Sequence, residues 1–132
     1  MGRPVYAGAD GVPVASSTPM DVPCTTLDDF CAAREIARIH FLKVDVEGYE
    51  RDVFRGAAGL LRERRIDFIT FEISQIPLKG AGLTARETFA ILEEHGYPSY
   101  RFDEQTERFE GPVKDSSEVW TNYFASWKEL NR

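Results

Sequence analysis

Residues 39–50 have the sequence Ile-His-Phe-Leu-Lys-Val-Asp-Val-Glu-Gly-Tyr-Glu, and this stretch decides the fold. Its first eight residues are mostly β-branched or aromatic, which predicts a strand over 39–46 that stops at Gly48. Over 49–65, apolar residues recur at the spacing that lays one face of a helix on a sheet. A strand followed at once by such a helix indicates an α/β protein.

The flanking segments extend this pattern in both directions. A second strand is predicted at 66–73, where the nearly continuous apolar run is typical of a parallel sheet with helices on both faces. Upstream, Thr26 is a good N-cap for a short helix. Downstream, residues 84–87 form a capping box for a helix that ends near Gly96.

The rest of the chain completes the predicted fold class. Two more strands are expected at 97–102 and 119–127, joined as a long antiparallel hairpin because no helical pattern separates them. The order of elements predicts an α/β fold whose mostly parallel sheet has right-handed crossovers and ends in this antiparallel hairpin. Segment 1–25 is rich in Pro and Gly and is predicted to be a loop with a possible short strand at 12–15. Residues 26–132 then form the domain.

The composition is that of one modest globular domain. The 132 residues are 42% hydrophobic and 12% aromatic, and 22 acidic against 16 basic residues give a net charge of −6. This balance argues against nucleic acid as a partner. No apolar run approaches the roughly 20 residues that span a bilayer, and no signal-peptide pattern follows Met1. The protein is therefore expected to be cytoplasmic, with no membrane partner.

Acidic side chains close both predicted parallel strands. Asp45 and Glu47 end the first strand, and Glu72 ends the second. Ligands of open α/β sheets bind beyond the carboxyl ends of the strands, so these three carboxylates are expected to gather at a ligand crevice. There they could orient a hydroxyl, accept its proton or share a cation. Asp45 is the first candidate for the base.

Plainer structural roles stay open for the same residues. Asp45 and Glu47 could cap backbone amides of the turn at Gly48 and of the helix that follows. Lys43 lies two residues before Asp45 and shares its face of the strand, so it either forms a structural ion pair or contacts a carboxylate of a substrate or cofactor. Glu50 is expected to be an acid of the first helical turn.

A divalent-metal site on Asp45, Glu47 and Glu72 is a further alternative, since hard cations take carboxylate oxygens. No histidine or further acid completes this set. The sequence therefore assigns no metal ligand.

Four short strings in the sequence form a characteristic set. They are Thr-Leu-Asp-Asp at 26–29, Lys-x-Asp-x-Glu-Gly-x-Glu at 43–50, Gly-Ala at 56–57 with Leu-Leu at 60–61, and Phe-Glu at 71–72. Together they resemble the FkbM family of S-adenosylmethionine-dependent methyltransferases. The resemblance implies that residues 26–132 are the C-terminal half of a Rossmann-like class I methyltransferase domain.

The resemblance also implies an activity. The expected reaction is methyl transfer from S-adenosylmethionine to a hydroxyl on a small molecule or sugar, with Asp45, Glu47, Glu72 and Lys43 as the catalytic candidates. The family's first half would carry a glycine-rich turn and an acid for the cofactor ribose, and the sequence contains neither. Lys-Gly-Ala-Gly at 79–82 lacks the third glycine and is expected to be a surface loop. Cofactor-binding residues are therefore unassigned.

The missing half supports a second hypothesis. A sheet cut after its first half has an unpaired edge and uncovered apolar faces. The chain would then be a non-catalytic truncated or split half-domain, acting as a homodimer or with the missing N-terminal half as its partner.

Overall fold

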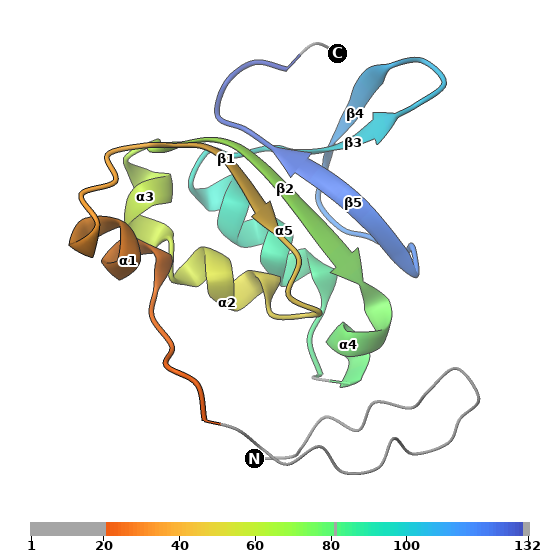
Figure 1. The fold of residues 1–132 in the computed structure, drawn as a ribbon. Coiled ribbons are helices and arrows are strands. Elements are labelled where there is room, and N and C mark those ends of the chain that lie inside the picture. Colours follow the sequence, from red (N-terminus) through yellow and green to blue (C-terminus); the bar gives the residue numbers. More distant parts are fainter. Residues whose placement is uncertain (1–20, 81, 131–132) are drawn as a thin grey trace.

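A computed structural model describes residues 21–80 and 82–130, which form a five-stranded sheet with helices packed against it (Figure 1). The strands are β1 (Ile39–Val44), β2 (Ile66–Ser74), β3 (Ser99–Asp103), β4 (Arg108–Val113) and β5 (Trp120–Ala125). The helices are α1 (Leu27–Ala33), α2 (Glu50–Arg55), α3 (Ala58–Arg62), α4 (Gln75–Gly80) and α5 (Ala85–Glu94). The possible strand at 12–15 lies outside the described residues.

The helices follow the predicted positions with two corrections. Thr26 caps α1 by accepting the Asp29 N–H at 3.0 Å, and the capping box of α5 is present. The helix predicted over 49–65 is broken into α2 and α3, because Gly56 ends the first of them. Helix α4 occupies part of the segment that was predicted to be a loop. None of the helices in the described ranges has the length and hydropathy that a membrane span requires.

The sheet has the order β1-β2-β5-β3-β4. Strands β1 and β2 are parallel, whereas β5 is antiparallel to both of its neighbours, β2 and β3. The prediction of a mostly parallel sheet is therefore wrong for the described strands, since one neighbouring pair is parallel and three are antiparallel. The cause is the insertion of β5, because β2 and β3 run in the same direction and β5 separates them.

The predicted antiparallel pairing of the last two strands is confirmed, but the connection between them is not a simple loop. Residues 108–113 form β4, which pairs with the outer side of β3. The sequence shows no strand pattern there, because Gly111 and Pro112 interrupt β4 and its side chains are mostly exposed. Strand β4 is therefore visible only in the tertiary structure.

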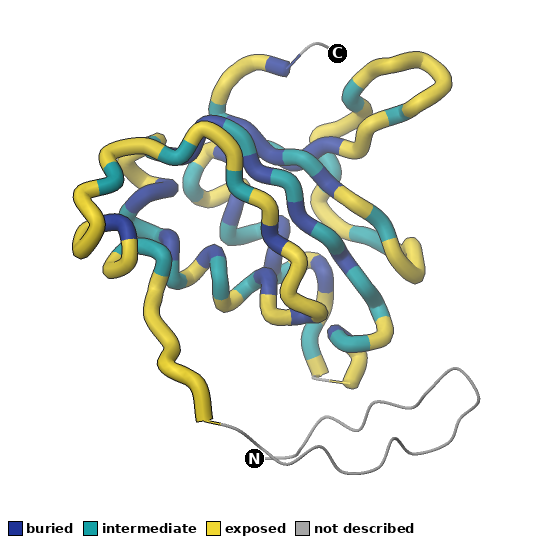
Figure 2. The backbone as a smooth tube through the Cα atoms, viewed as in Figure 1, coloured by how far each residue is buried: buried dark blue, intermediate teal, exposed yellow. Residues whose placement is uncertain are grey.

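The core lies between one face of the sheet and the helices. Along β2, Ile69, Phe71 and Ile73 are buried, while the residues between them are partly accessible (Figure 2). The Phe71 ring lies 5.5 Å from that of Phe54 in α2 and 5.6 Å from that of Phe89 in α5. Helices α1, α2, α3 and α5 all lie on this side of the sheet (Figure 1). The expectation of helices on both faces is therefore not met in the part described.

Candidate active site

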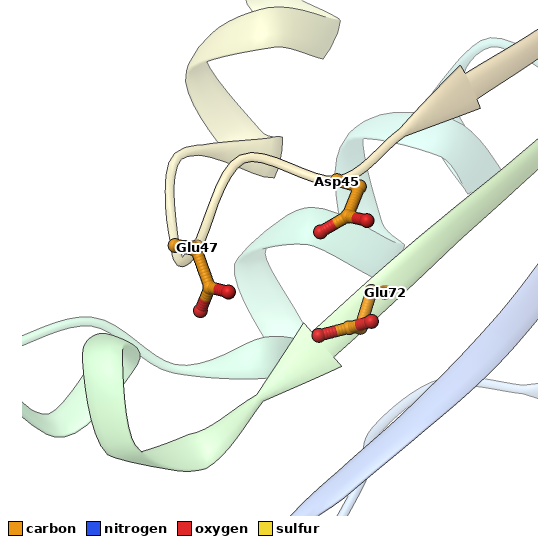
Figure 3. Close-up of side chains that lie close together, drawn as sticks. All are labelled: Asp45, Glu47 and Glu72. Atoms are coloured by element: carbon orange, nitrogen blue, oxygen red, sulfur yellow. The ribbon is translucent and has the colours of Figure 1, made fainter.

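Three carboxylates meet at the carboxyl ends of β1 and β2 (Figure 3). Asp45 is the first residue after β1, Glu47 lies in the turn that follows, and Glu72 lies near the end of β2. One oxygen from each carboxylate lies within 4.8 Å of the other two. Because β1 and β2 are parallel, their carboxyl ends reach the same edge of the sheet. The predicted gathering of Asp45, Glu47 and Glu72 is confirmed, and their chemical roles stay a prediction.

The turn that carries Glu47 has an unusual backbone. Glu47 has φ +51° and Gly48 has φ +97°, both in the left-handed region. A Cβ added to Gly48 would lie 2.9 Å from the Cβ of Pro77 in α4. A side chain at position 48 therefore meets both backbone strain and a close contact. Glycine allows the turn to close against α4 with Glu47 facing the other two acids.

The backbone amides of this turn are bound by a different acid from those expected. Glu50 Oε1 accepts hydrogen bonds from the Val46 and Gly48 N–H groups, each at 3.3 Å. Among the described residues, neither Asp45 nor Glu47 accepts a bond from a backbone amide. The capping alternative for these two residues is therefore wrong. Glu50 lies in the first turn of α2, as expected, but its side chain is buried, with only 1% exposure.

Lys43 forms an ion pair with Asp45, which is one of the two roles expected for it. Its Nζ lies 3.0 Å from Asp45 Oδ2, and the two side chains are 63% and 40% exposed. Ion pairs at such accessible positions contribute little to folding. The pair orients the Asp45 carboxylate, while the ammonium of Lys43 remains accessible to a ligand.

Strand β5 adds two side chains that the sequence did not assign to the site. Asn122 is paired in register with Glu72, and Trp120 with Ser74, so both lie on the same sheet face as Glu72. Trp120 is 59% exposed, whereas Tyr123 in the same strand is buried, with 3% exposure. An isolated Asn among aromatic residues was the available signal, but the neighbour of β5 could not be read from the sequence.

The site as a whole is acidic. The site holds three carboxylates and one ammonium, which pairs with Asp45, so the edge favours a positively charged ligand group, a proton or a cation. In the described ranges, Asp45, Glu47 and Glu72 are the group whose oxygens could hold a metal ion. Carboxylates in this arrangement can also accept the proton of a bound hydroxyl.

The five-stranded sheet and the helices packed on it define an α/β protein, with acids at the carboxyl ends of its parallel strand pair. The family model of the methyltransferase FkbM domain matches residues 6–99, more than two thirds of the chain. The chain therefore belongs to the FkbM methyltransferase family. Comparison with curated proteins and with solved structures gave no significant match. The matched range contains the three carboxylates, and β5 lies beyond it.

Proposed function

We propose that the chain contributes the acceptor side of an S-adenosylmethionine-dependent methyltransferase active site, with a hydroxyl of a small molecule or sugar as the methyl acceptor. The observation that carries the proposal is the cluster of Asp45, Glu47 and Glu72 at one sheet edge of an FkbM domain. In this proposal β1, β2, β3 and the inserted β5 are the C-terminal half of a Rossmann-like class I methyltransferase sheet.

The cofactor of this proposal fits the site in part. S-adenosylmethionine, when bound, supplies an electrophilic methyl group on a positively charged sulfur. The acidic edge formed by Asp45, Glu47 and Glu72 suits its positive sulfonium and amino groups. The turn at Gly48 offers no cradle for the adenosine, because Pro77 closes it. The described residues would therefore hold the charged end of the cofactor.

The chemistry of the acceptor side follows from the positions of the side chains. A hydroxyl bound between Asp45 and Glu72 donates a hydrogen bond to the Asp45 carboxylate. With the cofactor bound, its methyl carbon–sulfur bond would break as the acceptor oxygen bonds to that carbon, and the sulfur would leave as a neutral thioether. Asp45 would take the proton of the hydroxyl and later release it to water. Asn122 can hydrogen-bond a second polar group of the acceptor, and the exposed ring of Trp120 offers a flat apolar surface beside it. Orientation of this kind supplies much of the rate.

Transfer of a radioactive methyl group tests the proposal. The purified chain is incubated with methyl-tritiated S-adenosylmethionine and a panel of sugars, phenols and hydroxy acids. Wild-type protein should label at least one acceptor, and Asp45→Asn should lower the rate about 100-fold or more, the usual contribution of a general base. Glu104→Gln, an exposed acid between β3 and β4, is the matched control. Equal rates for the two variants, or no labelling by wild type, would contradict the proposal.

The second candidate function is a half-domain that acts through a dimer or through an N-terminal half supplied by a partner. The observation that favours it is the outer edge of β1, which has no neighbouring strand among the described residues. Phe41 in this strand is 60% exposed, on the sheet face that the helices do not cover. Unpaired edges and exposed apolar side chains favour association with another chain.

Light scattering on the full chain tests this second candidate. Wild-type protein at high concentration should be dimeric or larger, and Phe41→Lys should shift it toward monomer. Phe30→Lys is the control, because Phe30 is also exposed but belongs to α1 and not to the unpaired strand. A monomeric wild-type chain at high concentration would rule out the dimer, and methyl transfer by that monomer would rule out the need for a partner.

A further inference from the structure

We propose that Glu50 is the positioning residue of the carboxylate cluster, and that its buried carboxylate holds the turn which brings Asp45 and Glu47 to Glu72. Glu50 is the first residue of α2. Its hydrogen bonds go to backbone amides of the turn and not to the other three acids. It acts through the backbone of the turn. Its importance for catalysis rests on the proposed function, whereas its hold on the turn does not.

The hydrogen bonds of Glu50 bracket Glu47. One carboxylate oxygen accepts from the N–H of Val46, before Glu47, and from the N–H of Gly48, after it, each at 3.3 Å. Between these two bonds lies a glutamate at φ +51°, a conformation that residues with a side chain rarely adopt. A strained residue persists where its surroundings hold it. The two bonds from Glu50 supply that restraint.

The cluster also needs a restraint on electrostatic grounds. Three carboxylates with oxygens within 4.8 Å repel one another when they are charged, and Lys43 neutralises only Asp45 directly. Repulsion would move Glu47 away first, because it lies in a turn and not in a strand. The hydrogen bonds that hold the amides of Val46 and Gly48 resist this movement of Glu47.

Apart from its bonds to the turn, the Glu50 carboxylate makes no hydrogen bond among the described residues that explains its burial. Its second oxygen, Oε2, is buried and has no hydrogen-bond partner among the described residues, which is costly for a carboxylate. Favourable interaction with the helix dipole does not require burial. Asp52, in the same turn of α2, has a side chain 45% exposed and pairs with Arg51 and Arg55. The fold therefore places Glu50 against the turn at a cost that a surface acid avoids.

Hydrogen exchange and methyl transfer on the full chain test the inference together. Glu50→Ala removes both bonds, Glu50→Gln keeps an oxygen that can accept them, and Asp52→Ala is the matched control. In Glu50→Ala the amides of Val46 and Gly48 should exchange at least 10-fold faster, while the amide of Ile69 in β2 is unchanged. Its kcat should fall at least 10-fold with little change in the KM for S-adenosylmethionine. Glu50→Gln should recover most of the slow amide exchange and most of the kcat.

The outcomes separate the two proposals. Unchanged exchange at Val46 and Gly48 in Glu50→Ala, or an equal change in Asp52→Ala, would overturn the inference. Faster exchange in a chain whose wild type transfers no methyl group would overturn the proposed function and leave the hold on the turn intact. If Glu50→Ala does not fold, Glu50→Gln carries the test, because a neutral amide oxygen is a weaker acceptor than a carboxylate. In Glu50→Gln the amides of Val46 and Gly48 must then exchange faster than in wild type, while the exchange rate of the Ile69 amide is unchanged.

Discussion

At the scale of single residues, the geometry of the candidate site depends on one glycine and one lysine. Gly48 combines φ +97° with a close approach to Pro77, and Lys43 is the cation that pairs with Asp45. The first residue shapes the turn, and the second orients a carboxylate on its surface. Substitutions at the two positions should therefore differ in their effects on stability.

Gly48→Ala should destabilise the protein by about 2–3 kcal/mol, because the new methyl group meets both an unfavourable φ and the Cβ of Pro77 at 2.9 Å. Urea unfolding measures the loss. Gly82→Ala is the control, since Gly82 also has a positive φ of +69° but open space around it. Equal losses at the two positions would show that the contact with α4 contributes nothing.

Lys43→Met should leave the free energy of unfolding within about 1 kcal/mol of wild type, because the ion pair is exposed. Methyl transfer should fall, since Asp45 loses the cation that orients it and the site loses an accessible ammonium. Thermal unfolding and the tritium assay measure the two quantities on the same preparation. A variant that unfolds would instead assign Lys43 a structural role.

At the scale of elements, α3 depends on a residue from another helix. Its N-cap position is Ala57, which offers no side-chain acceptor. The Asp28 carboxylate of α1 takes that role, accepting the Gly59 N–H at 2.7 Å and the Leu60 N–H at 2.9 Å. An acid of one helix thereby caps a second helix and fixes the two against each other.

Asp28→Ala should destabilise the protein by about 2 kcal/mol, the usual range for hydrogen bonds to a charged group. Asp29→Ala serves as the comparison, because Asp29 is also in the first turn of α1 but its carboxylate accepts neither of these bonds. Urea unfolding of both variants separates capping of α3 from the favourable dipole interaction in α1. Similar losses for both variants would mean that the dipole interaction dominates.

At the scale of the whole molecule, Asp67 joins three distant segments at the end of the sheet opposite the candidate site. Its carboxylate contacts Arg38, His40 at 2.9 Å and Lys128 at 3.1 Å, which lie before β1, in β1 and after β5. The hydrogen bonds from His40, Lys128 and Arg38 outweigh the opposing effect of burial, and they hold the pKa of Asp67 well below its ordinary value of 3.8.

This lowered pKa predicts a pH dependence of stability. Because the folded pKa lies below the unfolded one, Asp67 stabilises the fold above about pH 4, and this contribution is lost as the pH falls through the unfolded pKa toward the folded one. Asp67→Asn should therefore be less stable than wild type at about pH 7, and the difference should narrow toward about pH 2.5. Urea unfolding across this pH range measures the difference in unfolding free energy between the two proteins. A difference independent of pH would show that the charge of Asp67 contributes nothing.

Much of the fold could be predicted from local patterns. The strands around Phe41 and Phe71, the helix capped by Thr26 and the helix opened by the capping box at Thr84 depend on residues that are near one another in the sequence. Propensity, capping and periodicity act over a few residues, so they are visible without a structure. The gathering of Asp45 and Glu72 followed from the same patterns, because parallel strands share an edge.

The tertiary structure alone decided the rest. The position of β5 between β2 and β3 brings Asn122 beside Glu72, although 50 residues of sequence separate them. The role of Glu50 depends on a turn that closes against Pro77, and the capping of α3 depends on Asp28 from α1. These contacts arise from packing between segments that no local pattern relates. The sequence by itself determined α1, α5, β1, β2 and the acidic edge, because these depend on local patterns. Long-range packing determined β4, the place of β5 and the side chains that complete and hold that edge.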